Sequence, residues 1–151
     1  MSRIALLDVN LLVALFDSGH IHHELAHDWF ADHRANGWAT CPVTENGFVR
    51  VLSAPRQDTP PMRAVESVER LRQFCSSPQH TFWPASLSLM DEKIFRPGLM
   101  RGHRQVTDVY LLGLAVSMGG CLATLDRGIP VTAVVGATRD NLQVISSAAD
   151  E

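Results

Sequence analysis

Four acidic residues occupy similar places in the chain, each directly after an apolar run or in the first turn of a predicted helix: Asp8, Glu45, Asp108 and Asp126. Asp8 is the most unusual, because it interrupts the apolar stretch IALLDVNLLVALF and a carboxylate is costly to bury without a compensating partner. Each acid alone has an ordinary explanation as a helix-start or turn residue. Their shared kind of position indicates one common site.

Carboxylates gathered in one site cannot all stay ionised without compensation. Two like charges about 4 Å apart repel by roughly 4 kcal/mol at an effective dielectric constant of about 20. Either some of the acids bind protons or a divalent cation binds among them. Oxygen ligands with no adjacent Cys or His favour Mg²⁺ or Mn²⁺ over zinc, and such an ion activates water and polarises a phosphoryl oxygen. The acids therefore predict a metal centre suited to phosphoryl chemistry.

Short apolar runs alternate with helical patterns along the chain, which is typical of a parallel sheet covered on both faces. The predicted strands are residues 4–7, 38–41, 80–83, 121–125 and 142–145. The predicted helices are residues 10–16, 20–33, 42–54, 62–75, 87–95 and 109–118, with Asn10 and Thr107 as caps. Ligands bind beyond the carboxyl ends of parallel strands, so we expect the acids to meet at that edge.

One predicted helix, residues 62–75, carries a regular apolar pattern. Its apolar residues have the spacing of a single buried helix face: Val65, Val68, Leu71 and Phe74. We expect this helix to pack with that face inward.

The composition is that of an ordinary globular protein. The chain has 151 residues, of which 46% are hydrophobic and 19% charged, which suits one domain with one core. Its three cysteines show no CxxC spacing, so we expect reduced thiols and a cytoplasmic protein. No apolar run reaches roughly 18 residues, so no membrane-spanning helix is predicted.

The net charge of −3 is unevenly distributed. Residues 46–104 hold nine Lys/Arg and five Asp/Glu, whereas the remainder holds four Lys/Arg and eleven Asp/Glu. An acidic region beside a basic one fits an enzyme that holds a metal at one place and phosphates at another. Chance charge on solvated helices fits the same numbers equally well.

Four segments of the sequence resemble the signature segments of PIN-domain ribonucleases, in the family order. They are LLDVN (residues 6–10), TENGFVR (44–50), TDVYLLGLA (107–115) and TLDRG (124–128). Within that family the chain most resembles VapC-type toxins of toxin–antitoxin systems. The resemblance runs from about residue 4 to 146. It implies one PIN domain over residues 1–151, with a three-layer α/β/α sandwich around a parallel sheet.

The resemblance also implies an activity and a set of site residues. The activity is metal-dependent endonucleolytic cleavage of single-stranded regions of cellular RNA by metal-activated water. The catalytic acids are Asp8, Glu45, Asp108 and Asp126, of which Asp8, Asp108 and Asp126 hold Mg²⁺ or Mn²⁺. The residues that position these acids or the substrate are Asn10, Thr44, Thr124 and Arg127.

Three partners follow from the same resemblance: an RNA substrate, a cognate antitoxin protein that neutralises the toxin, and a second copy of the chain in a homodimer. An amphipathic helix such as residues 62–74 could supply a groove for the antitoxin. The arginines that we expect to contact RNA phosphates are Arg50, Arg56, Arg63, Arg101 and Arg104.

Two other functions are compatible with parts of the sequence. HELAH at residues 23–27 fits the zinc-peptidase pattern H-E-x-x-H, with His23 and His27 as ligands and Glu24 as the base. A peptidase needs a third ligand, and no matching downstream helix provides one. The other alternative is a metal-binding α/β regulatory module without hydrolysis. Such modules also gather acids around Mg²⁺, but the chain has no Gly-rich phosphate loop and only one lysine, Lys93.

Overall fold

Five parallel strands form the central sheet of the computed structural model, which describes residues 3–147. The strand order is β3-β2-β1-β4-β5, and every neighbouring pair is parallel. The strands are β1 (Ala5–Leu7), β2 (Trp38–Thr40), β3 (His80–Phe82), β4 (Cys121–Thr124) and β5 (Leu142–Val144). All five predicted strands are present, each shorter than predicted by one residue.

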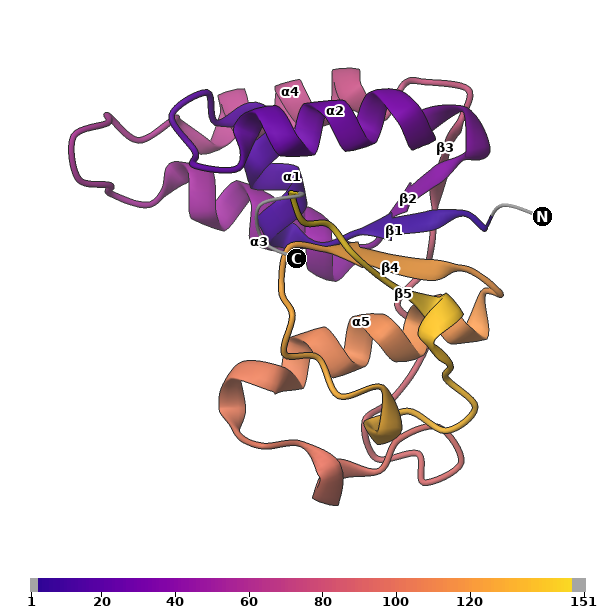
Figure 1. Ribbon diagram of the computed structural model, residues 1–151. Helices are drawn as coiled ribbons and strands as arrows, with labels where there is room; N and C mark the ends of the chain where they lie inside the picture. The colour runs from indigo at the N-terminus through magenta and orange to yellow at the C-terminus, as the bar shows by residue number, and fades with distance from the viewer. Residues whose placement is uncertain (1–2, 148–151) are drawn as a thin grey trace.

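Helices cover both faces of this sheet, so the predicted three-layer α/β/α fold is confirmed (Figure 1). One layer holds α1 (Val9–Phe16), α2 (His23–His33), α3 (Pro42–Ser53) and α4 (Ala64–Phe74). The other holds α5 (Val106–Ser117) with the loops around it. Neighbouring residues of β1 serve the two cores, because Leu7 is buried beneath α1 and Leu6 is buried against α5. None of the helices within residues 3–147 has the length and apolar character needed to span a membrane.

Helix α3 packs unusually close to α1. A side-chain carbon at Gly47 would lie 2.6 Å from Cγ2 of Val9, well inside van der Waals contact. Only glycine therefore allows α3 to approach the first residue of α1 at this separation.

The two residues predicted as helix caps, Asn10 and Thr107, do not cap their helices. The N-cap of α1 is Asp8, whose Oδ1 accepts the Val9 N–H at 2.7 Å, so the prediction of Asn10 as the cap is wrong. Asx residues cap equally well, and β1 ends one residue before Asp8. Thr107 lies inside the first turn of α5, because the 3₁₀ turn His103–Gln105 leads directly into a helix that starts at Val106.

The segment at residues 87–95 is not helical, contrary to prediction. The Ser88 hydroxyl oxygen accepts the Met90 N–H at 3.1 Å, and an Asp91 carboxylate oxygen accepts the Lys93 N–H at 3.0 Å. Such local side-chain acceptors stabilise turns at the expense of helix. Phe95 still packs into the core below α5.

Only the C-terminal half of the apolar face predicted for α4 is buried, because Leu71 belongs to the core and Phe74 packs against it. Val65 and Val68 are 64% and 40% exposed, whereas Ser67 is fully buried and Leu71 is 7% exposed. The Ser67 hydroxyl is satisfied by donating to the Arg63 carbonyl at 3.3 Å, so it is buried with little cost. Helix α4 therefore leaves two of the four predicted core residues, Val65 and Val68, in solvent.

Candidate metal centre

Asp8 lies at the carboxyl end of the central strand β1 and is only 3% exposed. Parallel pairing of Leu7 with Ala123 places the next residue of each strand, Asp8 and Thr124, side by side. The Thr124 hydroxyl donates to Oδ2 of Asp8 at 2.7 Å, while Oδ1 accepts from the Val9 amide. Both carboxylate oxygens are therefore fixed by neighbours from two elements.

Thr124 connects the start of α1, which follows β1, with the turn that follows β4. Its hydroxyl oxygen accepts the Asn10 side-chain amide at 3.3 Å and the Asp126 N–H at 3.0 Å. Asn10 in turn accepts the Leu125 N–H at 3.3 Å. These bonds tie the turn that carries Asp126 to the start of α1. Asn10 and Thr124 thus make the contacts that residues positioning the acids would need.

Asp108 lies in the first turn of α5 and interacts electrostatically with Asp8 and Asp126. Burial, the charge of Asp8 and a side-chain hydrogen bond with Asp126 raise the pKa of Asp108 to about 7. Burial also raises the pKa of Asp8 above its usual value; the Thr124 and Val9 bonds oppose this rise, and the charge of Asp126 adds to it. Two carboxylates share a hydrogen bond only when one holds a proton. Oxygen donors under this mutual repulsion fit a hard divalent cation, which would replace that proton.

A cleft of about 510 Å³ opens beside these acids. Its lining includes Asp8, Asp108, Arg50 and Arg56, so the acids share one hollow with two of the predicted phosphate contacts. Arg56 is paired with Asp17 at 2.7 Å. Negative and positive side chains therefore line the same cleft, an arrangement that can hold a cation beside a phosphate.

Comparison with known proteins agrees with this geometry. Residues 5–135 match the PIN domain family. Three relatives from Mycobacterium tuberculosis align over most of the chain. Ribonuclease VapC44 is 41% identical, covering 93% of this chain and 99% of the relative. Ribonuclease VapC39 is 38% identical (87% and 95%), and Ribonuclease VapC29 is 44% identical (82% and 86%).

The chain belongs to the VapC-type PIN domain family.

The remaining predicted arginines of this PIN domain lie at other places. Arg101 and Arg104 line a separate hollow just before α5. That loop is tied to the Asp126 turn, because the Gln105 side-chain amide donates to the Gly128 carbonyl at 2.9 Å. Arg63 is the N-cap residue of α4 and is not among the residues that line the cleft beside Asp8.

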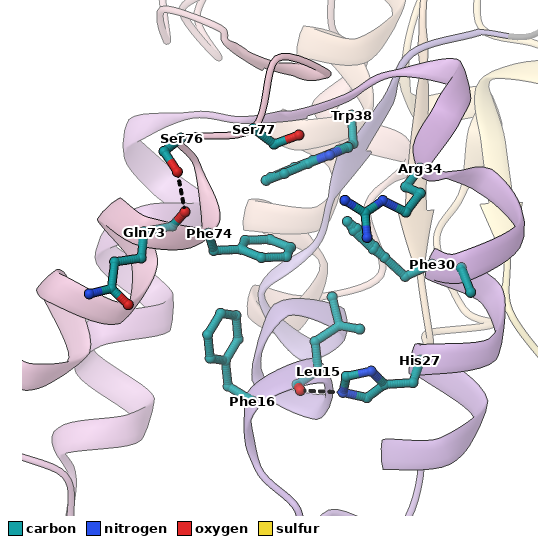
Figure 2. Close-up of a pocket in the computed structure, with 11 residues that line it drawn as sticks. Leu15, Phe16, His27, Phe30, Arg34, Trp38, Gln73, Phe74, Ser76 and Ser77 are labelled. Carbon is teal, nitrogen blue, oxygen red and sulfur yellow. Dashed lines mark hydrogen bonds between the residues drawn. The ribbon is translucent and has the colours of Figure 1, made fainter.

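The histidines of the HELAH segment satisfy the end of α1. A ring nitrogen of His23 bonds the Ala14 carbonyl at 2.7 Å, and one of His27 bonds the Leu15 carbonyl at 2.7 Å (Figure 2). Carbonyls in the last helical turn lack partners within the helix, so these rings fill a structural need. Within residues 3–147, no group of three clustered potential ligands includes either histidine. The structure gives the zinc-peptidase alternative no support.

An apolar cavity of about 490 Å³ lies between α1, α2 and α4 of the PIN domain. Its aromatic walls come from all three helices and from β2, and Figure 2 shows them facing one another: Phe16, Phe30, Trp38 and Phe74.

Thr44 directly precedes Glu45, and Arg127 directly follows Asp126. The Thr44 hydroxyl accepts the Cys41 N–H at 3.0 Å and donates to the Cys41 carbonyl at 3.1 Å, closing the first turn of α3. Thr44 therefore acts on the helix that carries Glu45 rather than on a carboxylate. Arg127 is exposed in the turn after Asp126.

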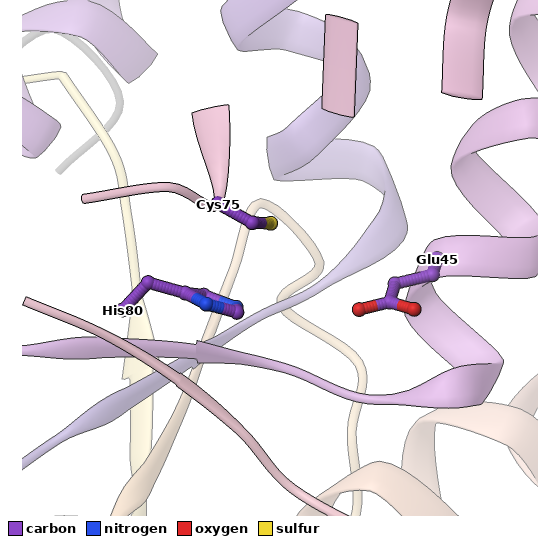
Figure 3. Close-up of side chains that lie close together, drawn as sticks. All are labelled: Glu45, Cys75 and His80. Atoms are coloured by element: carbon purple, nitrogen blue, oxygen red, sulfur yellow. The ribbon is translucent and has the colours of Figure 1, made fainter. Parts of the chain in front are cut away.

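Glu45 belongs to a different group of side chains from the three aspartates. Its Oε2 accepts the Thr40 hydroxyl at 2.7 Å, and the same Thr40 oxygen lies 2.8 Å from Nε2 of His80. Cys75 completes this group (Figure 3). The structure thus brings Asp8, Asp108 and Asp126 together and holds the Glu45 carboxylate on Thr40.

The surroundings of Glu45 affect the titration of its neighbours. Burial raises the pKa of the Cys75 thiol to about 11; the Thr40 hydrogen bond opposes this rise and the Glu45 charge adds to it. Burial lowers the pKa of His80, which the Glu45 charge and a bond to the Cys75 main chain oppose. Sequence reasoning missed Thr40, Cys75 and His80, because no sequence motif connects residues from β2, β3 and the end of α4.

Proposed function

We propose that this chain is a Mg²⁺- or Mn²⁺-dependent endoribonuclease that cleaves single-stranded regions of cellular RNA, with the metal held by Asp8, Asp108 and Asp126. The ribonuclease names of the three relatives support the activity. One observation carries the site: carboxylates from the ends of β1 and β4 and the start of α5 lie close enough that their charges add to burial in raising the pKa of Asp8 and Asp108.

The residues of the chain have distinct tasks in this proposal. A bound divalent cation supplies Lewis acidity and a water of lowered pKa. Thr124 and Asn10 fix the direction of the Asp8 carboxylate, and Asp108 presents its carboxylate from a rigid helical turn. Arg50 and Arg56 bind substrate phosphates in the cleft, and Arg127 contacts the substrate beside Asp126. Glu45 joins the catalytic acids when its carboxylate turns away from Thr40, and Thr44 holds the helix turn that carries it.

The proposal is tested by incubating labelled RNA with the purified chain and Mn²⁺, with and without a chelator. We expect cleavage that the chelator abolishes and that Asp8→Asn or Asp108→Asn lowers by about 100-fold or more, because a metal ligand is lost. Glu92→Gln, an exposed acid remote in sequence from all four segments, is the matched control and should cleave normally.

Cleavage that survives the chelator, or aspartate variants as active as Glu92→Gln, would overturn the proposal. Metal binding without cleavage by the wild-type chain would instead favour the regulatory module, which the names of the relatives do not support. Sequencing the 5′ ends produced in total RNA after brief induction identifies the substrate RNA.

The antitoxin is proposed to bind at the apolar cavity between α1, α2 and α4. Cavities walled by aromatic side chains accept the apolar face of a partner helix. Ala31 is exposed on α2 and lines this cavity, whereas Ala35 is exposed beyond the helix and does not. Ala31→Glu should weaken co-purification with the antitoxin and Ala35→Glu should not; equal binding by both variants would exclude this cavity.

Three further expectations from the resemblance belong to the same proposal. The chain acts as one PIN domain over residues 1–151, in the cytoplasm, and forms a homodimer. The exposed Val65 and Val68 on α4 support an interface, because apolar residues side by side on a helix favour association. Sedimentation of the purified chain measures the oligomeric state.

A further inference from the structure

Glu45, Cys75 and His80 form a compact group of three different donor types, here called the Glu45 group. Their ligand atoms, a carboxylate oxygen, a sulfur and a ring nitrogen, all lie within 4.8 Å of one another. They come from the first turn of α3, the residue after α4 and the first residue of β3. Figure 3 shows the Cys75 thiol and the His80 ring side by side, with the Glu45 carboxylate facing them.

This donor set differs chemically from that of the aspartates. Zn²⁺ prefers thiolate sulfur, imidazole nitrogen and carboxylate oxygen in a tetrahedral arrangement, whereas Mg²⁺ prefers oxygen alone. Bond lengths of about 2.0–2.3 Å place tetrahedral zinc ligands about 3.5 Å apart. Side-chain movements of about 1 Å would therefore bring the three ligand atoms of the Glu45 group to the separations of tetrahedral zinc ligands. Three protein ligands leave a fourth position for water.

The three side chains gather around the hydroxyl oxygen of Thr40. This oxygen is 2.7 Å from Glu45 Oε2, 2.8 Å from His80 Nε2 and 4.0 Å from Cys75 Sγ. Thr40 is fully buried in β2, so its position is fixed by the sheet. The His80 ring is further held against Trp38, with ring centroids 4.7 Å apart. A ligand set held by rigid elements loses little side-chain entropy when it binds a metal.

We propose that Glu45, Cys75 and His80 form a second metal site that takes Zn²⁺, separate from the aspartate centre that takes a hard divalent cation. Binding forms bonds from the metal to the sulfur, a ring nitrogen and a carboxylate oxygen, and it releases the thiol proton to solvent. Resting on the proposed function, one consequence follows: zinc holds the Glu45 carboxylate away from the aspartates and inhibits RNA cleavage.

The binding test uses the full chain without RNA and Co²⁺ as a spectroscopic substitute for Zn²⁺. We expect one equivalent of Co²⁺ with a thiolate-to-cobalt charge-transfer band that Zn²⁺ abolishes and Mg²⁺ does not. Cys75→Ala should remove the band, and His80→Gln should weaken Zn²⁺ binding by about tenfold or more. Cys121→Ala, at another buried thiol, and Asp108→Asn, at the aspartate centre, are matched controls that should keep the band.

Three results would overturn the zinc site: no charge-transfer band in the wild-type chain, a band that survives Cys75→Ala, or a band lost with Asp108→Asn. Circular dichroism verifies that each variant is folded. If Cys75→Ala fails to fold, an unchanged Zn²⁺ affinity of His80→Gln overturns the site independently.

The inhibition test compares Zn²⁺ titrations of Mn²⁺-dependent RNA cleavage, each variant normalised to its own rate without zinc. We expect Cys75→Ala to need about tenfold more Zn²⁺ for half-inhibition than the wild-type chain. If Cys75→Ala and the wild-type chain were half-inhibited at the same Zn²⁺ concentration, inhibition through the Glu45 group would be refuted. Because the Co²⁺ test needs no RNA, a chain that binds cobalt at Cys75 but cleaves no RNA would fail the proposed function and keep the zinc site.

Discussion

Two buried threonines, Thr40 and Thr124, end the two strands that flank β1, which are β2 and β4. They make similar hydrogen bonds but lie in chemically different surroundings. Each is the last residue of its strand, fully buried, and each donates its hydroxyl to an acid at 2.7 Å. Thr124 holds Asp8 and accepts two N–H groups from the loops of the aspartate centre. Thr40 holds Glu45 and bonds the imidazole of His80.

The difference lies in what surrounds each acid. At the aspartate centre, burial and like charges act together: the charge of Asp126 adds to the rise in the pKa of Asp8, and the charge of Asp8 adds to that of Asp108. Glu45 faces His80 and Cys75, which do not repel it and which bind softer metals. Similar strand ends therefore build a hard-cation site in one place and a mixed-donor group in the other, depending on the loops that meet there.

Replacing Thr124 should produce the largest effect. Thr124→Val removes the hydroxyl from the buried Asp8 carboxylate and leaves the Asn10 and Asp126 donors without their acceptor. We expect a loss of about 1–3 kcal/mol in the free energy of unfolding and a fall in cleavage of about 10- to 100-fold. Urea unfolding and single-turnover cleavage measure these. The control is Thr81→Val on the exposed strand β3; equal behaviour of both variants would refute the role of Thr124.

The repulsion among the aspartates predicts an unusual pH dependence. The pKa of Asp108 is raised to about 7 in the folded chain, so the folded state holds a proton that the unfolded state has already lost. Without metal, stability should be highest below pH 4 with respect to this group and fall as the pH rises to about 7. Asp108→Asn removes this loss.

The expected gain for Asp108→Asn at pH 8 is small, because Asp108 is half exposed and water screens the repulsion. We expect about 1 kcal/mol, or a few degrees in Tm, measured by thermal unfolding in chelator. Saturating Mg²⁺ should narrow the difference by stabilising the wild-type chain. A variant less stable than wild type at pH 8 would contradict the repulsion.

Replacing Thr40 should cost less than replacing Thr124. Glu45 and His80 are only half-buried, so both polar groups turn to water when Thr40→Val removes the hydroxyl. We expect a loss of about 1 kcal/mol or less in the free energy of unfolding and a smaller fall in cleavage than for Thr124→Val. Urea unfolding and single-turnover cleavage measure both variants. A larger loss of unfolding free energy or of cleavage for Thr40→Val than for Thr124→Val would contradict this prediction.

The smallest effect is expected at Arg50. Arg50 lines the cleft beside Asp8, whereas Arg63 is not among its lining residues. In an Asp8→Asn background, Arg50→Gln should lower the salt slope of RNA binding by about one unit, and Arg63→Gln should leave it unchanged. Equal slopes would remove Arg50 from the RNA-binding surface.

The sequence predicted the sheet and the meeting of the aspartates because both depend on a simple rule. Strands buried on both faces are apolar at nearly every position, so residues 4–7 and 121–125 are readily identified. Residues that follow parallel strands emerge at one edge, which brings Asp8 beside Thr124.

The direction of the Glu45 side chain could not be predicted in this way. Its place in the first turn of α3 follows from Pro42 and Thr44, but its rotamer depends on Thr40 and His80 from two strands. Likewise, the turns at residues 87–95 depend on which side-chain acceptors reach the backbone, a competition that apolar spacing does not report.

The absence of a side chain at Gly47 fixes the separation between the backbone segments that carry Asp8 and Glu45. Asp8 directly precedes Val9, and Glu45 stands two residues before Gly47, so the contact that forbids a methyl group there also sets how far apart the two backbones lie. Any larger residue at position 47 would push α3 away from α1, and this would change the distance between Asp8 and Glu45. Substitution at this buried position is therefore constrained by the spacing of the two acids as much as by folding.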